Sequence, residues 1–488
     1  MRVPTGFGFL LLPFLPLGGG CDGGDDPVAD GGDVPVEARD DGGDVPPLDC
    51  SFPAPRLGTS AEAAALAAAP ARCGQPPFRW LDDETLGDVV AVGPATGFRA
   101  ASLSDAAQRE GFELPREILY DAAVRTVTYV TQDRGELLEA TAMVAYPFEP
   151  TDGRTSFDVL LLLHGTSGFT DGCGIAGDDE YHIIAALFAS VGYLVVAPDY
   201  IGLRSLGAST GFPHPYLVGQ ATAIASLDAV RALGKLTAAQ RGDLCVEPRF
   251  VAFGGSQGGH ATLWVDRLAA YYAAELELRG VVATVPPSDL LGQGELALSS
   301  VIDATGNTIA FLALAAPWYG YADRLDEIFV PPLDAAIPAA LAGSCDPEDD
   351  LPDYVALDEV FPAPLLEATA AGTLGEHEPW GCLFAENGLT TTSIARLPPT
   401  GVHYGVLFVL AENDDLVDTP TERVAFGTLC GQGMRMEYLE CAGAGHVDGT
   451  FWALPEIIDF ADARMAGEAF DSPTVCELQA AVRCRGTP

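Results

Sequence analysis

The serine at position 256 stands where an apolar segment ends in glycines and a helix-like segment begins. Gly254, Ser256 and Gly258 form the pattern G-x-S-x-G, which in a nucleophile elbow holds the serine on a strained strand-to-helix turn. Glycines two residues to either side let the strand and the helix approach without Cβ clashes. The helix N-terminus supplies free N–H groups beside a developing oxyanion. The pattern therefore predicts a serine hydrolase with Ser256 as nucleophile, although a pentapeptide alone also fits an ordinary glycine-rich turn.

A serine nucleophile needs a base, and His446 is the best candidate in this chain. In one recurrent triad the acid and then the base follow the serine along the sequence. His446 is expected on a loop of small residues between a strand at 434–439 and a helix at 451–464, from which it can reach the serine. Its alternative role is to cap that helix. The other histidines after the serine are expected in packing or surface positions: His260, His377 and His403.

The orienting acid is expected directly after the apolar segment 406–410. Asp414 is the first candidate and Asp415 the second, and the alternative is an acidic turn without a catalytic role. The acid orients the base and stabilises its charged form.

Acyl transfer also needs two N–H donors for the oxyanion. The N–H of Gln257, which follows the nucleophile, is the first. The loop that begins at His164 is expected to supply the second, from Thr166 or otherwise Gly165, unless this segment is only a tight turn.

The elements that must position these residues indicate an α/β fold with a mostly parallel sheet flanked by helices on both faces. Continuous apolar segments predict strands at 124–131, 140–146, 159–163, 193–197, 249–253, 281–285, 404–410 and 434–439. Helices are expected at 61–71, 181–191, 216–236, 261–274, 296–314 and 451–464.

More than a hundred residues separate the strands expected at 281–285 and 404–410. A structureless loop of that length is implausible. We therefore expect a helical cap, or lid, over the carboxyl edge of the sheet, where such sheets bind ligands; the alternative is a separate packing subdomain. The predicted organisation is a signal peptide (1–20), an acidic disordered tether (21–49), an N-terminal extension (50–120), a first core segment (121–286), the cap (287–400), a second core segment (401–470) and a C-terminal tail (471–488).

The N-terminus resembles an export signal. Arg2 precedes a mainly apolar segment at 7–17, which is too short to span a membrane as a mature helix. Three glycines then lead to Cys21, as at a bacterial lipoprotein cleavage site, so Cys21 is a candidate for lipidation and membrane attachment. Ordinary secretion is the alternative.

Ten cysteines remain of the 11 once Cys21 is set aside, and an even number in an exported chain predicts disulfides. Several could instead be free buried thiols. Proximity in sequence favours the pairs Cys50–Cys73, Cys173–Cys245, Cys345–Cys382, Cys430–Cys441 and Cys476–Cys484. No cysteine or histidine spacing suggests a zinc site, so neither a metal nor a cofactor is expected.

The chain has 25 basic and 69 acidic residues, a formal net charge of −44. Such a chain repels nucleic acid phosphates and anionic lipid surfaces, which argues against a nucleic acid partner.

Several motifs together resemble the secretory lipase family of exported α/β-hydrolases over roughly residues 120–465. The resemblance is carried by His164-Gly165-Thr166, Pro198-Asp199-Tyr200, His214-Pro215-Tyr216, the glycines around Ser256, Pro286-Pro287 and Gly443-Ala444-Gly445-His446. It implies an α/β-hydrolase core, a lid inserted before the acid-bearing strand, and hydrolysis of small-molecule carboxylic esters or lipids through the triad Ser256, Asp414 and His446. Asp418 stands where the family often has proline, and the segment after Thr166 also departs from the family pattern.

Two other functions remain open from the sequence. The same triad can cleave amides, which would make the protein a peptidase or amidase. A catalytically silent surface binding protein is the third hypothesis.

Overall fold

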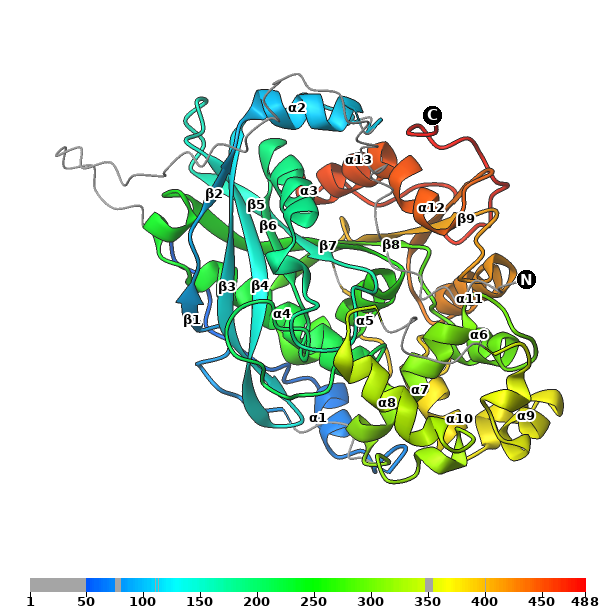
Figure 1. Ribbon diagram of the computed structural model, residues 1–488. Helices are drawn as coiled ribbons and strands as arrows, with labels where there is room; N and C mark the ends of the chain where they lie inside the picture. Colours follow the sequence, from blue (N-terminus) through cyan, green and yellow to red (C-terminus); the bar gives the residue numbers. More distant parts are fainter. Residues whose placement is uncertain (1–49, 75–79, 110, 113, 347–353, 400) are drawn as a thin grey trace, which may run out of the picture.

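The computed structural model describes residues 50–74, 80–109, 111–112, 114–346, 354–399 and 401–488 (Figure 1). The predicted signal peptide, the acidic tether and Cys21 lie outside the described residues. Within the described part of the chain, no helix is both long and apolar enough to cross a bilayer.

A ten-stranded mixed sheet forms the centre of the molecule (Figure 1). The strands are antiparallel from β1 to β6 and parallel from β6 to β10. Their order is β1 (Val89–Val92), β3 (Asp121–Asp133), β4 (Glu136–Phe148), β6 (Leu194–Pro198), β5 (Ser156–Leu163), β7 (Cys245–Gly255), β8 (Glu277–Thr284), β9 (Gly405–Ala411) and β10 (Met436–Cys441), while β2 (Thr96–Phe98) pairs with β3.

Every apolar segment predicted as a strand forms one, in β3 to β10. These segments are continuously apolar because helices cover both faces of the parallel part. One face carries α4 (Gly219–Lys235) and α5 (Gln257–Tyr272), and the other carries α3 (Asp179–Ser190) and α13 (Leu454–Met465) (Figure 1). The smaller helices α1 (Ala61–Ala67) and α2 (Ala100–Arg109) belong to the N-terminal part of the chain.

Two predicted helices are each divided in two. The segment expected at 451–464 forms α12 (His446–Trp452) and α13, because Pro455 has no N–H and favours the first turn of a new helix. The segment expected at 296–314 is broken between α6 (Leu290–Ala297) and α7 (Thr305–Tyr319), where two serines follow α6.

A group of helices is inserted between β8 and β9 and lies together at one side of the sheet (Figure 1). In addition to α6 and α7 it contains α8 (Leu333–Gly343), α9 (Ala363–Ala370) and α10 (Trp380–Asn387). Most residues of α7 are buried, so this helix packs as part of the protein interior.

The ten cysteines form five disulfides, as their even number predicted, but every pairing suggested by proximity in sequence is wrong. The bonds are Cys50–Cys245, Cys73–Cys382, Cys173–Cys345, Cys430–Cys476 and Cys441–Cys484. The partners are between 43 and 309 residues apart in the chain. Cα atoms must lie within about 7 Å for a disulfide, and packing of distant segments decides which ones do.

Candidate active site

All the candidate residues follow the carboxyl ends of parallel strands, which share one edge of the sheet. Leu163 pairs with Gly254 across β5 and β7, and Cys441 pairs with Ala411 across β10 and β9. The loops after these strands contain the predicted oxyanion segment, the serine, the acid and the base. The parallel topology therefore brings segments separated by hundreds of residues to one place.

Ser256 joins β7 to α5 in a strained conformation with a positive φ of 56° and a ψ of −121°. A Cβ built on Gly254 would lie 2.5 Å from the carbonyl oxygen of Gly258, and one built on Gly258 would lie 2.0 Å from that of Leu163. Only glycine fits at either position, which is the close approach that the G-x-S-x-G pattern predicts. The strain at Ser256 is typical of a residue whose side chain must project from a tight turn.

His446 and Asp414 contact each other directly. His446 Nδ1 lies 2.9 Å from both carboxylate oxygens of Asp414, and both side chains are buried. Because a carboxylate only accepts, Nδ1 carries the proton and Nε2 is left with its lone pair. Nε2 of His446 is buried and has no hydrogen-bond partner among the described residues.

The loop that contains Asp414 also holds its carboxylate in place. Asp414 Oδ1 accepts hydrogen bonds from the N–H groups of Leu416 (2.9 Å) and Val417 (2.8 Å). The neighbouring Asp415 is exposed and does not contact His446. The geometry therefore distinguishes between two adjacent aspartates that the sequence analysis left as alternatives for the acid.

His446 is the first residue of α12 rather than part of a loop before a helix, as the sequence analysis expected. Gly445 is the N-cap, and the helix begins there because β10 ends at Cys441 and a short turn follows. Thr450, one helical turn after His446, hydrogen bonds to Thr284 at 2.6 Å. A Cβ on Gly255 would lie 2.8 Å from Thr450 Oγ1, so α12 packs directly against the elbow.

The predicted oxyanion donors are two N–H groups without an acceptor among the described residues. Gln257 is the first residue of α5, so its N–H has no intrahelical acceptor. The N–H of Thr166 shares a planar trans peptide with the carbonyl of Gly165 and points the opposite way. That carbonyl lies 2.6 Å from His164 Nδ1, which orients the peptide.

Two neutral histidines support this region. Burial lowers the pKa of both His164 and His214 to about 4, so both rings are uncharged near neutral pH. His214 Nδ1 lies 2.8 Å from the carbonyl oxygen of Ile201 and therefore donates to it. Its Nε2 accepts from the Gln257 amide at 3.1 Å, which holds the side chain of the residue beside Ser256.

A pocket with about 520 Å³ of empty space opens beside the serine. Its lining combines Ser256 and Gln257 with apolar side chains of the inserted helices and of the loop after Asp414. These apolar residues include Leu290, Phe311, Phe384, Leu416 and Val417. The lining suits an uncharged organic group placed against the serine.

Sequence reasoning missed Glu422, a completely buried carboxylate in α11 (Thr419–Gly431). It accepts hydrogen bonds from the N–H and hydroxyl of Ser288, from the N–H of Asp289 at 3.3 Å and from Gln293 Nε2 at 2.9 Å. Gln293 also bonds to the N–H of Asp418 at 3.0 Å. Glu422 thus links the first residues of the insertion to the loop that contains Asp414, and nothing in the local sequence of Glu422 marks it.

This network predicts a specific pH dependence of stability. Burial raises the pKa of Glu422 from 4.5 to about 7, so the folded protein holds this proton more tightly than the unfolded chain. The contribution of Glu422 to the free energy of unfolding is therefore fully present below about pH 4.5 and lost as the pH rises through about 7. In urea titrations between pH 5 and 8, we expect Glu422→Gln to lack this component of the decline. Glu376→Gln, at an exposed glutamate, should keep the wild-type slope; an unchanged slope in Glu422→Gln would contradict the prediction.

The three other histidines that follow Ser256 in the sequence occupy other positions in the structure. His260 is buried in the first turn of α5, and its Nε2 lies 2.8 Å from the carbonyl oxygen of Asn387. His403 precedes β9 in a turn, where it lies 3.3 Å from Glu277. His377 ends a short 3₁₀ turn of the insertion.

Comparison with known proteins relates this chain to lipases and esterases. Residues 173–310 match the family model of the secretory lipases. Lipase 2 of Candida albicans is 24% identical over 293 residues, an alignment that covers 57% of this chain and only 56% of that protein.

Solved structures share the fold at lower identity. A putative hydrolase from Legionella pneumophila superposes with a TM-score of 0.62 at 21% identity, covering 78% of this chain and 100% of that one. The rice cell wall degrading esterase LipA from Xanthomonas oryzae superposes with a TM-score of 0.61 at 20% identity, covering 78% of this chain and 97% of that one. The protein thus has the α/β-hydrolase fold, and its predicted resemblance to the secretory lipase family is confirmed by the match over residues 173–310.

Proposed function

We propose that this protein is a serine carboxylic ester hydrolase that acts through an acyl-enzyme on Ser256. The observation that carries the proposal is the buried Asp414–His446 pair, with Nε2 of His446 unpartnered among the described residues, in a helix that packs against the elbow of Ser256. The lipase and esterase relationships support ester hydrolysis in general, and this arrangement suits a serine mechanism.

In the first half of the reaction, Ser256 Oγ attacks the ester carbonyl carbon while His446 Nε2 takes the hydroxyl proton. The N–H groups of Gln257 and Thr166 stabilise the negative oxygen of the tetrahedral intermediate. Asp414 stabilises the imidazolium of His446 and keeps its orientation. The intermediate collapses when His446 returns the proton to the departing alkoxide, which leaves as the alcohol.

In the second half, water attacks the acyl carbon and gives a proton to His446. Collapse of this second intermediate restores the proton to Ser256 Oγ and releases the carboxylic acid. The chemistry needs only side chains and backbone groups of this chain.

Export is part of the same proposal. The five disulfides and the secretory lipase match suggest an exported protein. We propose that Cys21 is lipidated, which would attach the enzyme to a membrane through residues 22–49; metabolic labelling with a palmitate analogue, compared between wild type and Cys21→Ser, tests this.

An active-site probe tests the function directly. A fluorophosphonate should label the purified wild-type protein, and peptide mass spectrometry should locate the adduct on Ser256. In parallel, p-nitrophenyl butyrate should be hydrolysed much faster than the matched butyryl p-nitroanilide. Labelling of another serine, or none, would contradict the proposal; preferred cleavage of the anilide would make the protein an amidase.

A further inference from the structure

The helices inserted between β8 and β9 are fastened to the rest of the protein at several separate points. We infer that this cap is fixed and does not open as a lid. The site beneath it then takes its ester substrates as single dissolved molecules, without activation at a lipid–water interface. The inference about substrate rests on the ester hydrolysis proposed above. The sequence analysis expected a cap, or lid, at this place; the inference adds that this cap does not open.

Two disulfides join the cap to segments outside it. Cys345, after α8, is bonded to Cys173 in the loop between β5 and α3. Cys382, in α10, is bonded to Cys73 in the N-terminal extension. That extension is itself bonded to the sheet through Cys50 and Cys245 at the start of β7. The cap therefore has covalent links on two sides.

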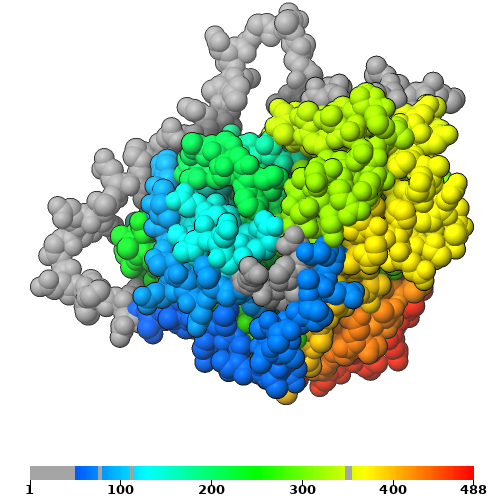
Figure 2. Space-filling model, turned by 90° about the horizontal axis from the view of Figure 1, so that it is seen from below, coloured from blue at the N-terminus to red at the C-terminus, as the bar shows by residue number. Residues whose placement is uncertain are grey.

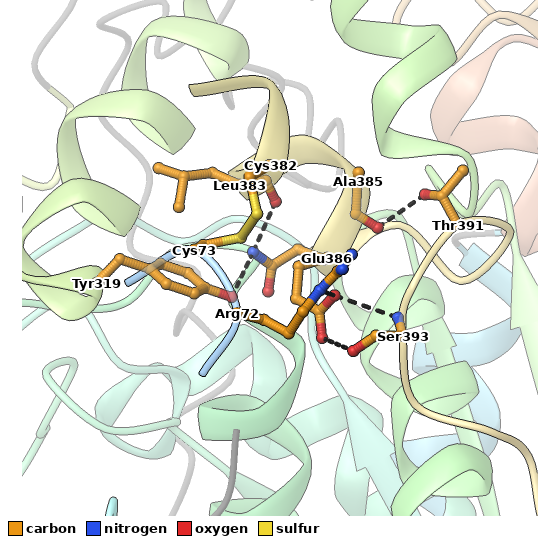
Figure 3. Close-up of a disulfide and its surroundings, with 10 residues drawn as sticks. Arg72, Cys73, Tyr319, Cys382, Leu383, Ala385, Glu386, Thr391 and Ser393 are labelled. Atoms are coloured by element: carbon orange, nitrogen blue, oxygen red, sulfur yellow. Dashed lines mark hydrogen bonds and ion pairs between the residues drawn. A yellow bond between two sulfur atoms is a disulfide. The ribbon is translucent and has the colours of Figure 1, made fainter. Parts of the chain in front are cut away.

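The Cys73–Cys382 disulfide lies beside an ion pair and several hydrogen bonds (Figure 3). Arg72, beside Cys73, forms an ion pair at 3.5 Å with Glu386, one turn after Cys382 in α10. Glu386 is almost wholly buried and also accepts from the N–H and hydroxyl of Ser393. In the space-filling view the blue N-terminal segment lies beside the yellow surface of the cap (Figure 2).

Asn387, the last residue of α10, connects the cap to two core helices. Its side-chain oxygen accepts from the N–H of Gly219 in α4 at 3.2 Å, and its carbonyl accepts from Trp264 Nε1 in α5 at 3.1 Å. Its amide also donates to the Tyr319 hydroxyl of α7 at 3.0 Å. These groups are buried, so separating the cap from the core would leave several polar groups without partners.

The far end of α7 is fastened to the antiparallel edge of the sheet. Trp318 Nε1 donates to Asp133 at 2.9 Å, and Arg134 donates to the Trp318 carbonyl at 2.5 Å. At the opposite end, where the cap joins the core, the N–H of Leu389 donates to the Ser288 carbonyl at 2.8 Å. Ser288 is in turn held by Glu422. The two ends of the insertion are thus joined to each other and to α11.

The described outer surface of the cap also exposes few large apolar side chains that could contact a lipid–water interface. Among the described residues of 287–400, the exposed large apolar side chains are only Leu296 and Val355. A contiguous exposed apolar patch is the surface feature that marks membrane contact. The net charge of −44 adds repulsion from anionic surfaces. A dissolved substrate therefore reaches the pocket beside Ser256 by diffusion, without prior contact with a lipid surface.

Wild-type kinetics with tributyrin test the inference without any mutation. Initial rates are measured from well below to well above the solubility limit of this ester, with the emulsion area controlled. We expect saturation with dissolved substrate and less than a twofold rise on crossing the limit. A rise of fivefold or more in the initial rate at the solubility limit would contradict a fixed cap but would leave ester hydrolysis supported. Absence of turnover in both phases would overturn the proposed function, and the substrate inference with it.

Amide hydrogen exchange tests directly whether the cap is fixed. In the wild-type protein, peptides of α7 should be protected as strongly as peptides of α5. The double variant Cys173→Ser/Cys345→Ser should exchange at least tenfold faster in α8 than wild type, whereas Cys441→Ser/Cys484→Ser, which removes a disulfide between β10 and the C-terminal tail, should leave α8 unchanged. Should the first variant not fold, the wild-type comparison still decides, because fast exchange of α7 beside a protected α5 would refute a fixed cap.

Discussion

Replacement of Ser256 with alanine is expected to lower kcat for p-nitrophenyl butyrate by about 10⁶-fold, as when a triad serine is removed. The variant keeps the Cβ and loses only the oxygen that attacks the ester. Without it no acyl-enzyme forms, and the oxyanion donors can assist only direct attack by water. Because alanine and serine meet similar strain at a φ of 56°, the fold should not change.

The appropriate measurements are steady-state kinetics and a thermal unfolding curve for each variant. Ser299→Ala provides a matched control, since Ser299 is exposed on the cap and its hydroxyl bonds only to the carbonyl of Glu295. It should retain wild-type kcat and KM. If Ser256→Ala kept a tenth or more of the wild-type kcat at an unchanged melting temperature, Ser256 would not be the nucleophile.

The second large effect concerns the choice between two adjacent aspartates. Asp414→Asn is expected to lower kcat by about 10⁴-fold, as when a triad aspartate is converted to its amide. The asparagine oxygen can still accept from Leu416 and Val417, which leaves its NH₂ group facing His446 Nδ1. The imidazole must then carry its proton on Nε2, so it can no longer accept the serine proton.

Asp415→Asn makes the same chemical change one position along the chain and serves as the control. Its carboxylate is exposed and does not contact His446, so kcat should stay within about twofold of wild type. Kinetics of both variants at pH 7 and 8 decide the question. A greater loss in Asp415→Asn than in Asp414→Asn would assign the orienting role to Asp415.

Much of the fold can be read from local sequence because local physics determines it. Continuous apolar segments such as 159–163 and 249–253 become buried parallel strands, since only such strands need apolar side chains on both faces. The tight turn at Ser256 is equally local, because Gly254 and Gly258 are required by backbone contacts a few residues away. The helix break at Pro455 was missed even though its cause is local.

The candidate site can likewise be predicted from local sequence only in part. The sequence alone predicts Ser256, the order of its partners and His446 as candidates, since glycine turns and strand ends are visible in the chain. Only the tertiary structure decided that Asp414 rather than Asp415 faces His446, that Cys73 reaches Cys382 and that Glu422 links the cap to the acid loop. These are contacts between side chains brought together by packing, and separation along the chain carries no information about them. For the same reason, the sequence could predict a cap, but only the folded molecule shows how firmly that cap is held.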